Sequence, residues 1–393
     1  MSSITNLLPA VVIGGPPHSG KSVLAYSLSH ALRLQNVPHY VLRAYPDGEG
    51  DWANEADLDL VRALRIKGIG TPEWTRRVAR DISVRPFPLI IDPGGKPTAW
   101  QEAIFRECTH GILLCPDPSS HAEWLERFQA HHLILLADLK SELHGENVLE
   151  SISGHLRGTL AGLERGQIAS GPAFERLVEW LARLFGYSAA ELREFHLKQA
   201  PAETVIELDR LGRTLGSLDA QRHWIVSELP RVLDYLPRAK PIALYDRAPN
   251  WLYAALARHA FPSDFFQFDA RLGWVRPPLL QQAIANPEGP VRSRLTQFEE
   301  FAAIKFELAD SYLDYIDAES LVVPHVPERT GLVLDGRLPL WLWTALARVY
   351  TQVLWLAIYQ PQFHDHALVI QSNLAAPQAG IRIPYTPQRN SLE

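Results

Sequence analysis

A glycine-rich loop that directly follows a short apolar run constrains this chain most. The loop reads Gly15-Pro16-Pro17-His18-Ser19-Gly20-Lys21-Ser22, with the pattern G-x-x-x-x-G-K-S, and the run before it is Ala10–Ile13. This order predicts a buried strand, a phosphate-binding loop and a helix from about Val23 onward. Backbone N–H groups of such a loop and the helix N-terminus can surround a β-phosphate. The pattern therefore predicts that the chain binds a nucleoside triphosphate.

The polar positions of this loop have separate expected roles. Lys21 is expected to reach the β- and γ-phosphates, and the Ser22 hydroxyl to help hold Mg²⁺. Asp92 ends the apolar run Pro88–Ile91, where a carboxylate can hold the same ion directly or through water. A turn residue that merely ends the strand is the alternative for Asp92. The predicted cofactors are ATP and Mg²⁺, and the other expected nucleotide contacts are Gly15, His18, Ser19 and Gly20.

Strand-like and helix-like runs alternate from residue 1 to about residue 187, which predicts an α/β domain with a parallel sheet and helices on both faces. Ligands of such sheets lie at the carboxyl ends of the strands. This half resembles the nucleoside-kinase-like branch of P-loop NTPases, on the strength of the loop and Asp92. The five strand-like runs are Ala10–Ile13, His39–Arg43, Pro88–Ile91, Gly111–Cys115 and Leu133–Leu136.

Two charged segments of this half are weaker candidates for the site. Asp47–Trp52 carries three acids, which could position an acceptor hydroxyl or form a solvated acidic loop. Arg76, Arg77 and Arg80 follow Pro72 on an expected helix and could supply charge to a γ-phosphate. A solvated helix face is the favoured interpretation of these arginines.

Composition restricts the partners and the compartment. The formal net charge is −6, which argues against binding long nucleic acids. The two cysteines, Cys108 and Cys115, fit a reducing cytoplasm, and no signal peptide precedes the loop. Leu338–Tyr359 is long enough to span a bilayer, but Arg348 and Gln352 lie near its middle. We expect a buried helix and a buried strand there, in a soluble cytoplasmic protein without a membrane partner.

The second half contains an internal repeat. Residues 247–258 align without gaps on residues 337–348, at a constant spacing of 90 positions. β-like runs stand before and after each copy, so the repeat unit is predicted to be a small α/β module, and two copies favour a pseudo-symmetric pair. Eight of the twelve aligned pairs are identical: Arg247/Arg337, Pro249/Pro339, Trp251/Trp341, Leu252/Leu342, Ala255/Ala345, Leu256/Leu346, Ala257/Ala347 and Arg258/Arg348.

The repeated order of strand, G-R-x-P-x-W-L-[YW], helix, strand and D-x-R-L-G resembles the third ring nuclease family of type III CRISPR systems. The resemblance covers about residues 200 to 375, and fusions to a P-loop ATPase domain occur in that family. It implies binding of cyclic tetra-adenylate and its cleavage with a divalent metal, usually Mn²⁺. The predicted organisation is a P-loop domain at 1–187, two ring-nuclease-like copies at 188–290 and 291–376, and a tail at 377–393.

The two copies have diverged in complementary ways. The second keeps Asp335–Leu342 intact, whereas the first has Asp246 at the glycine position. The first keeps Asp269-Ala270-Arg271-Leu272-Gly273, whereas the second reads Gln360–His364 there. By the resemblance, Asp269 is expected to bind metal and Arg271 to stabilise charge on a phosphodiester oxygen. An ion pair that locks the turn is the alternative.

The remaining candidates are less specific. The family's His-Pro pair aligns with Phe261-Pro262, so His259 could substitute only if the loop shifted, and a helix cap is the favoured interpretation. His364 and His366 alternate along an expected strand and could reach a metal, although an exposed polar strand is favoured. Arg247 and Arg337 are expected ligand contacts. Trp251 and Trp341 are read mainly as core residues, with adenine stacking as the alternative.

The favoured function is an ATP-binding P-loop protein with a tandem module that binds, or also cleaves, cyclic tetra-adenylate. One alternative is a small-molecule kinase with a structural C-terminal module. Another is a non-catalytic sensor controlled by nucleotide. A homo-oligomer is expected, because P-loop domains of this kind often assemble symmetrically.

Overall fold

The computed structural model describes residues 8–45, 71–94, 97–284, 289–309 and 313–387. The chain divides into two compact units, the first comprising residues 1–198 with Ala270–Gly273 and the second the remainder. The first unit extends past the expected boundary at 187 because helix α8 (Ala189–Lys198) belongs to it, with the His196 imidazole 2.6 Å from the Pro86 carbonyl oxygen. The acidic segment Asp47–Trp52 lies outside the described residues.

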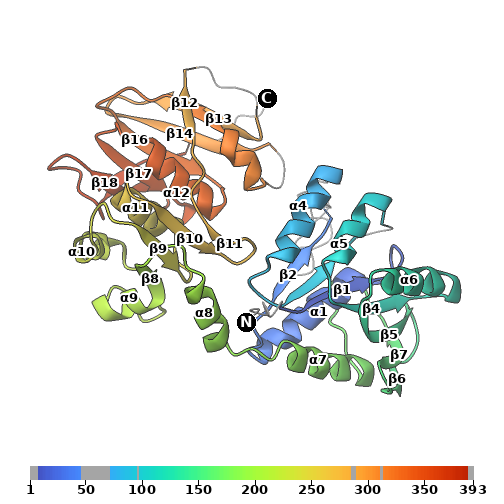
Figure 1. Ribbon diagram of the computed structural model, residues 1–393. Coiled ribbons are helices and arrows are strands. Elements are labelled where there is room, and N and C mark those ends of the chain that lie inside the picture. The colour runs from blue at the N-terminus through green and yellow to red at the C-terminus, as the bar shows by residue number, and fades with distance from the viewer. Residues whose placement is uncertain (1–7, 46–70, 95–96, 285–288, 310–312, 388–393) are drawn as a thin grey trace, which may run out of the picture. The chain divides into compact units, whose positions relative to one another are not determined.

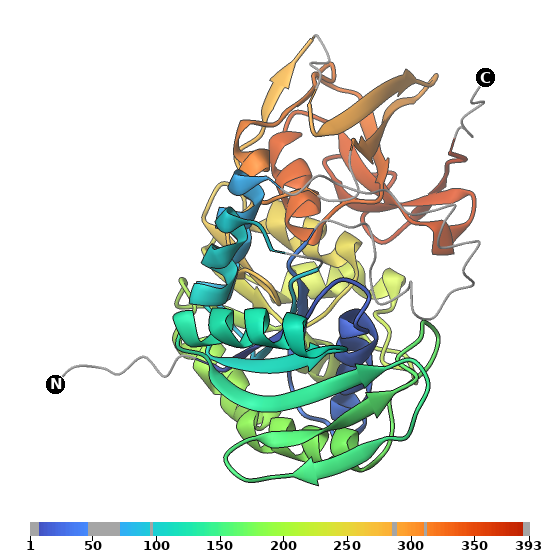
Figure 2. The same ribbon diagram turned by 90° about the vertical axis from the view of Figure 1, so that its right-hand side faces the viewer.

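The first unit contains a seven-stranded sheet in the order β2-β3-β1-β4-β5-β7-β6 (Figure 1). All neighbouring strands are parallel except β6 and β7, so the expected parallel α/β sheet is confirmed. In Figure 2 the green strands of residues 134–161 lie together at one edge of this sheet. The strands are β1 (Ala10–Gly14), β2 (Tyr40–Arg43), β3 (Leu89–Asp92), β4 (His110–Cys115), β5 (Ile134–Glu142), β6 (Val148–Ser151) and β7 (Leu156–Ala161).

Helices cover both faces of this sheet, which is why its central strands are apolar throughout. Alternate residues of β1 point to opposite faces: Val11 and Ile13 pack with α1 and α7, whereas Ala10 and Val12 pack with α4, α5 and α6. Each face therefore has its own apolar core. The bounds are α1 (Lys21–Leu34), α4 (Pro72–Ser83), α5 (Glu102–Arg106), α6 (Pro118–Ala130) and α7 (Pro172–Leu184).

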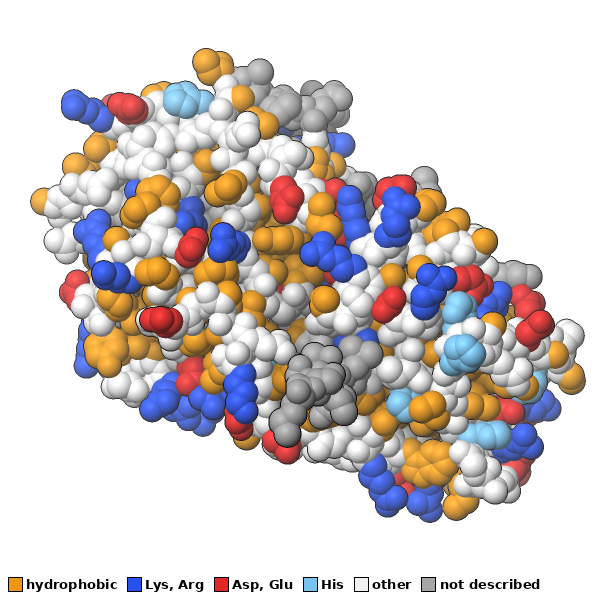
Figure 3. All heavy atoms as spheres, in the orientation of Figure 1, with side chains coloured by type: hydrophobic (Ala, Val, Ile, Leu, Met, Phe, Trp, Pro, Cys, Tyr) orange, Lys and Arg blue, Asp and Glu red, His pale blue; other side chains and the backbone are white. Residues whose placement is uncertain are grey.

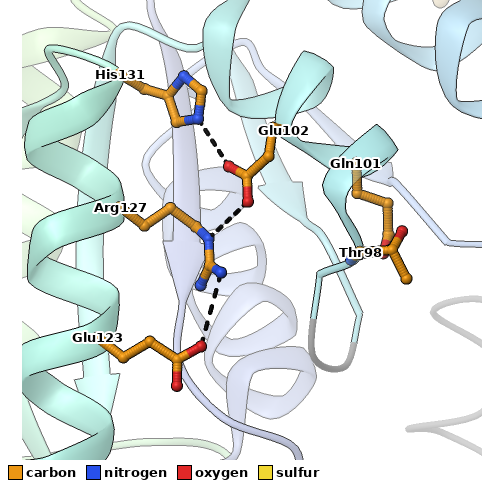
Figure 4. Close-up of polar contacts among 6 residues, drawn as sticks. All are labelled: Thr98, Gln101, Glu102, Glu123, Arg127 and His131. Atoms are coloured by element: carbon orange, nitrogen blue, oxygen red, sulfur yellow. Dashed lines mark hydrogen bonds and ion pairs between the residues drawn. The ribbon is translucent and has the colours of Figure 1, made fainter.

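A polar cluster fixes α5 against α6 (Figure 4). The Glu102 carboxylate accepts a hydrogen bond from Arg127 Nε at 3.0 Å and lies 2.7 Å from His131 Nε2. Arg127 also lies over the Trp124 ring, 4.8 Å from its centroid. Before α5, Thr98 and Gln101 form a capping box. The Glu102 carboxylate of α5 is thus held by one residue of α6 and by the residue that follows this helix. The cluster therefore stabilises the packing of α5 against α6.

The second unit contains two strand–helix–strand modules, as the repeat predicts. In each, a helix connects two parallel neighbouring strands: β9–α11–β10 and β16–α12–β17. The sheets are β11-β10-β9-β8, β13-β14-β16-β17-β18-β19 and the pair β12-β15. The strands are β8 (Val205–Glu207), β9 (Ile242–Tyr245), β10 (Phe265–Asp269), β11 (Gly273–Val275), β12 (Gln281–Ala283), β13 (Val291–Gln297), β14 (Phe301–Leu308), β15 (Val322–Pro324), β16 (Gly331–Gly336), β17 (Trp355–Tyr359), β18 (His366–Ser372) and β19 (Arg382–Pro384).

The helices of the two modules, α11 (Asn250–Ala260) and α12 (Leu340–Val349), pack against each other (Figure 1). The aligned arginines cross this seam: Arg258 Nη2 donates to the Thr351 carbonyl at 3.0 Å, and Arg348 Nη1 donates to the Ala257 carbonyl at 3.1 Å. The two short helices of this unit are α9 (Leu208–Leu215) and α10 (Leu229–Tyr235). The repeat therefore forms an internal pair with reciprocal contacts.

Both repeat helices are apolar on every side because both are core elements. Residues 251–257 and 341–347 are buried without exception. The apolar segment Leu338–Tyr359 consists of α12 followed by the buried strand β17, as expected. Among the described residues, no helix is both long and apolar enough to cross a membrane.

Candidate functional site

The glycine-rich loop closes around the side chain of Lys21, the first residue of α1. Lys21 is 5% exposed, and its Nζ donates to the carbonyl oxygens of Gly15 at 2.8 Å and Pro16 at 2.6 Å. Glycine is required at position 15, since a Cβ there would lie 2.1 Å from the Leu114 carbonyl oxygen. Gly20 adopts a φ of 88°, which also favours glycine. The loop thus surrounds a single buried ammonium group.

Ser22 and Asp92 meet at the carboxyl edge of the sheet, because β1 and β3 are parallel neighbours. Ser22 Oγ donates to Asp92 Oδ2 at 2.6 Å, and Arg43 Nη1 lies 3.3 Å from the same oxygen. The Gly94 N–H donates to the other oxygen at 3.2 Å. Asp92 therefore caps the turn that ends β3 and also contacts the glycine-rich loop. A structural role in the turn is thus compatible with a role in holding Mg²⁺.

Burial alters the chemistry of Lys21. It lowers the pKa of this amine to about 8, while Asp92 and Cys115 act in the opposite direction. Among the described residues, the amine of Lys21 forms no ion pair with a carboxylate. Its present acceptors are neutral carbonyl oxygens, which stabilise an ammonium ion less than phosphate oxygens do.

The Ser19 hydroxyl of the loop has no hydrogen-bond partner among the described residues. Ser19 is 2% exposed. Its backbone carbonyl accepts a bond from Ser141 Oγ of β5 at 2.8 Å, which fixes the loop from the neighbouring strand. His18, with a φ of 64°, has an exposed side chain. The predicted residues Gly15, His18, Ser19, Gly20, Lys21 and Ser22 all lie in this one loop.

Two of the three arginines of α4 are exposed. Arg76 pairs with Glu73 at 3.0 Å, and its side chain is 69% exposed. Arg80 is also exposed, whereas Arg77 is half-buried. The positions of Arg76 and Arg80 agree with the favoured interpretation of a solvated helix face.

The structure assigns Asp269 and Arg271 to different units. Asp269 ends β10 in the second unit, whereas residues 270–273 group with the first. There, Arg271 Nε donates to Asp81 Oδ2 on α4 at 2.7 Å. Arg271 thus forms an ion pair with Asp81, a partner that sequence reasoning did not identify.

His259 and Asp269 lie at opposite ends of β10. Since β9 and β10 are parallel, α11 returns the chain to the amino edge of the sheet, and His259 is in its last turn. The five residues of β10 then carry the chain about 13 Å to Asp269. His259 Nε2 lies 3.0 Å from the Leu236 carbonyl oxygen. His259 is therefore not brought beside Asp269, whereas Arg271 is two residues from Asp269 in the sequence and pairs with Asp81.

The expected ligand contacts of the repeat fall into two groups. Arg247 and Arg337 follow β9 and β16, and both are exposed, without a hydrogen bond or ion pair to any described residue. Trp251 and Trp341 are 3% and 4% exposed, so neither indole face is open to a base in this arrangement. The position directly before each arginine differs between the copies. Asp246 has a φ of 81°, whereas a Cβ at Gly336 would lie 2.7 Å from the Phe306 carbonyl oxygen.

The histidines near the C-terminus do not alternate along one strand, so that expectation is wrong. His364 lies in the turn before β18, with a φ of 56°, because the 3-10 turn of residues 361–363 ends there. His366 begins β18 and pairs with Asp365 at 2.9 Å. Across the described ranges, no group of three or more His, Cys, Asp or Glu residues could hold a metal ion.

Sequence reasoning missed a buried acid in the second module. Asp335 of β16 is 7% exposed, and the Tyr385 hydroxyl donates to its Oδ2 at 3.2 Å. Burial raises the pKa of Asp335, partly opposed by this hydrogen bond. The signal was present, since Asp335 ends an apolar run as Asp92 does.

Comparison with known proteins gives one family. Residues 306–384, from β14 to β19, match the CRISPR-associated protein family Cas_csx3. No curated protein matches the chain. The matched span contains β16, α12 and β17, and therefore the whole second module. The C-terminal part of this chain is thus similar to a CRISPR-associated protein family.

Proposed function

We propose that the first unit binds ATP with Mg²⁺ and that the second binds cyclic tetra-adenylate in type III CRISPR signalling. The convergence of Lys21, Ser22 and Asp92 at one strand edge carries the first part. The Cas_csx3 match, together with the paired modules, supports the second.

The residues of the loop fit a triphosphate. Lys21 would exchange two carbonyl acceptors for phosphate oxygens, and the unpartnered Ser19 hydroxyl would gain an acceptor. Ser22 and Asp92 supply the hydroxyl and carboxylate oxygens that Mg²⁺ prefers. Bound there, Mg²⁺ would neutralise phosphate charge.

The arrangement of the predicted catalytic residues favours binding of the cyclic ligand over its cleavage. Arg271 is paired with Asp81, and His259 lies at the opposite end of β10 from Asp269. The second module has neither an acid nor an arginine at the equivalent turn. Arg247 and Arg337 remain exposed cations at pseudo-equivalent positions, and they are suited to phosphates of a symmetric cyclic ligand.

One experiment distinguishes binding from cleavage. The protein is mixed with labelled cyclic tetra-adenylate and Mn²⁺, with and without ATP, and both the bound ligand and the linear product are measured. We expect binding that Arg247→Ala and Arg337→Ala each weaken about tenfold, since each removes a charge-assisted hydrogen bond. Linear product that disappears in Asp269→Asn, but not in Asp365→Asn at an exposed acid, would establish a nuclease. Absence of binding in both conditions would refute the proposal for this unit.

The kinase alternative makes a different prediction for the first unit. A kinase should form ADP in proportion to an added nucleoside-like acceptor and ignore cyclic tetra-adenylate. The proposed protein should bind ATP without such an acceptor. Its affinities for ATP and the cyclic ligand should be reciprocally coupled if the two sites communicate.

ATP affinity should depend on pH through Lys21. The pKa of the free amine is lowered to about 8, and phosphate oxygens beside it would raise that value in the complex. A group with a higher pKa in the complex takes up a proton on binding, so affinity should be highest below pH 8 and fall as pH rises past 8. Calorimetry in buffers of different ionisation enthalpy at pH 8.5 should show proton uptake. Unchanged affinity from pH 7 to pH 9.5 would contradict this.

A further inference from the structure

A cavity of about 530 Å³ lies in the second unit, outside the sites discussed above. Its walls come from α10 and the segment after it, the C-terminal end of α11, and the end of β18. It lies at the amino edge of β10, because its wall includes His259 and Phe261, and is thus opposite the edge that carries Asp269. Its volume is in the range of small-molecule sites.

The charge of this cavity is unbalanced. Arg238 and Arg258 line it, and Arg348 lies behind them across the helix seam. The pKa of Arg258 is lowered mainly by burial and further by the charges of Arg238 and Arg348. The three guanidinium groups are therefore close enough to repel one another. None of the three forms an ion pair with a carboxylate in the described parts of the chain. The acids nearby are Asp234 on the cavity wall and Asp264, which acts on Arg348, and both are exposed.

The remaining wall has an apolar part and a polar part. The Phe261 ring is 39% exposed, with the guanidinium of Arg258 5.6 Å and that of Arg348 5.3 Å from its centroid. On the polar part, Gln371 Nε2 donates to Asn373 Oδ1 at 2.8 Å. An apolar face and clustered guanidinium groups therefore converge on one space.

We propose that this cavity binds the phosphate monoester of a nucleoside. The phosphate group would lie against Arg238 and Arg258, whose planar donors match its oxygens. The apolar part of the ligand would lie on Phe261 and Leu233. This goes beyond the proposed function, since it needs neither the glycine-rich loop nor the Asp269 edge.

The test uses the full chain with Lys21→Ala, so that the loop does not contribute, and titrates adenosine 5′-monophosphate, inorganic phosphate and adenosine separately. We expect the monophosphate to bind more tightly than either other probe. Arg238→Glu should weaken it at least about tenfold, because a charge-assisted hydrogen bond is replaced by repulsion. Arg292→Ala, at an exposed arginine of β13, is the matched control and should leave affinity unchanged.

Arg238 is exposed, so its replacement should not affect folding, whereas Arg258→Gln also alters the seam and is checked by its melting temperature. Equal binding of adenosine and its monophosphate would overturn the assignment of the phosphate to the arginines. Inorganic phosphate binding as tightly as the nucleotide would overturn the apolar contact. An unchanged dissociation constant in Arg238→Glu would overturn the proposal altogether.

Discussion

Lys21→Ala is expected to abolish ATP binding while leaving the first unit folded. Among the described residues, the acceptors of the Lys21 amine are two carbonyl oxygens of its own loop. Phosphates would replace them with charged acceptors, and each such bond contributes about 1.5–3 kcal/mol. Losing both should raise the dissociation constant by at least about 100-fold. This is the largest single effect that we expect on ligand binding.

The same substitution should not destabilise the free protein. Burial lowers the pKa of Lys21, so the folded chain disfavours this charge. Its removal relieves a desolvation cost, which offsets the loss of the donor to Gly15 and Pro16. Loss of binding can therefore be read without interference from unfolding. Lys198→Ala is the matched control, because that lysine ends α8 in the same unit with its side chain 73% exposed.

Thermal denaturation with and without Mg²⁺–ATP distinguishes the outcomes. A ligand at 100 times its dissociation constant stabilises the folded state by about 2.7 kcal/mol. The wild-type chain and Lys198→Ala should show this stabilisation, and Lys21→Ala should not. Equal stabilisation in all three proteins would exclude the glycine-rich loop as the nucleotide site.

The first unit was predictable where local pattern decides the structure. Strands such as β1 and β3 are buried on both faces, so each appears in the sequence as an uninterrupted apolar run. The loop after β1 needs glycine at fixed positions, so its sequence pattern also identifies it. The polar contact between α5 and α6 was not predictable. It joins Glu102 to Arg127 and His131, which are 25 and 29 residues away in the sequence.

The second unit shows the complementary case. The repeat predicted two strand–helix–strand modules because equal sequences fold equally, and the strands flank the helices as expected. Aligned motifs did not reveal which residues share a site. His259 and Asp269 are ten positions apart, yet a whole strand separates them, and Arg271 pairs with Asp81 at a sequence distance of 190. Such pairings follow from topology and packing, which single motifs do not encode.

Divergence between the copies also left a buried polar contact that has no counterpart in the other half of the pair. Thr344 Oγ1 of α12 donates to Gln267 Oε1 of β10 at 2.7 Å, and both residues are fully buried. The aligned positions, Ala254 and Ala357, are both alanine, so the contact occurs once in the pair. Pairing two first copies from separate chains would set Gln267 against Ala254 and leave its amide unsatisfied. The contact therefore favours pairing within one chain.

Thr344→Val should accordingly destabilise the second unit by about 1–3 kcal/mol, since Gln267 Nε2 already lacks a partner and Oε1 would lose its own. Hydrogen exchange of the α12 amides reports this cost locally, without assuming that both units unfold together. Thr296→Val on β13 is the control for the loss of a hydroxyl.

In Thr344→Val with Gln267→Leu, both polar groups are gone, and stability should return to the wild-type value or above it. If the two substitutions simply added their costs, the hydrogen bond would not be the source of the effect, and pairing specificity would have to reside in the arginines that cross the seam.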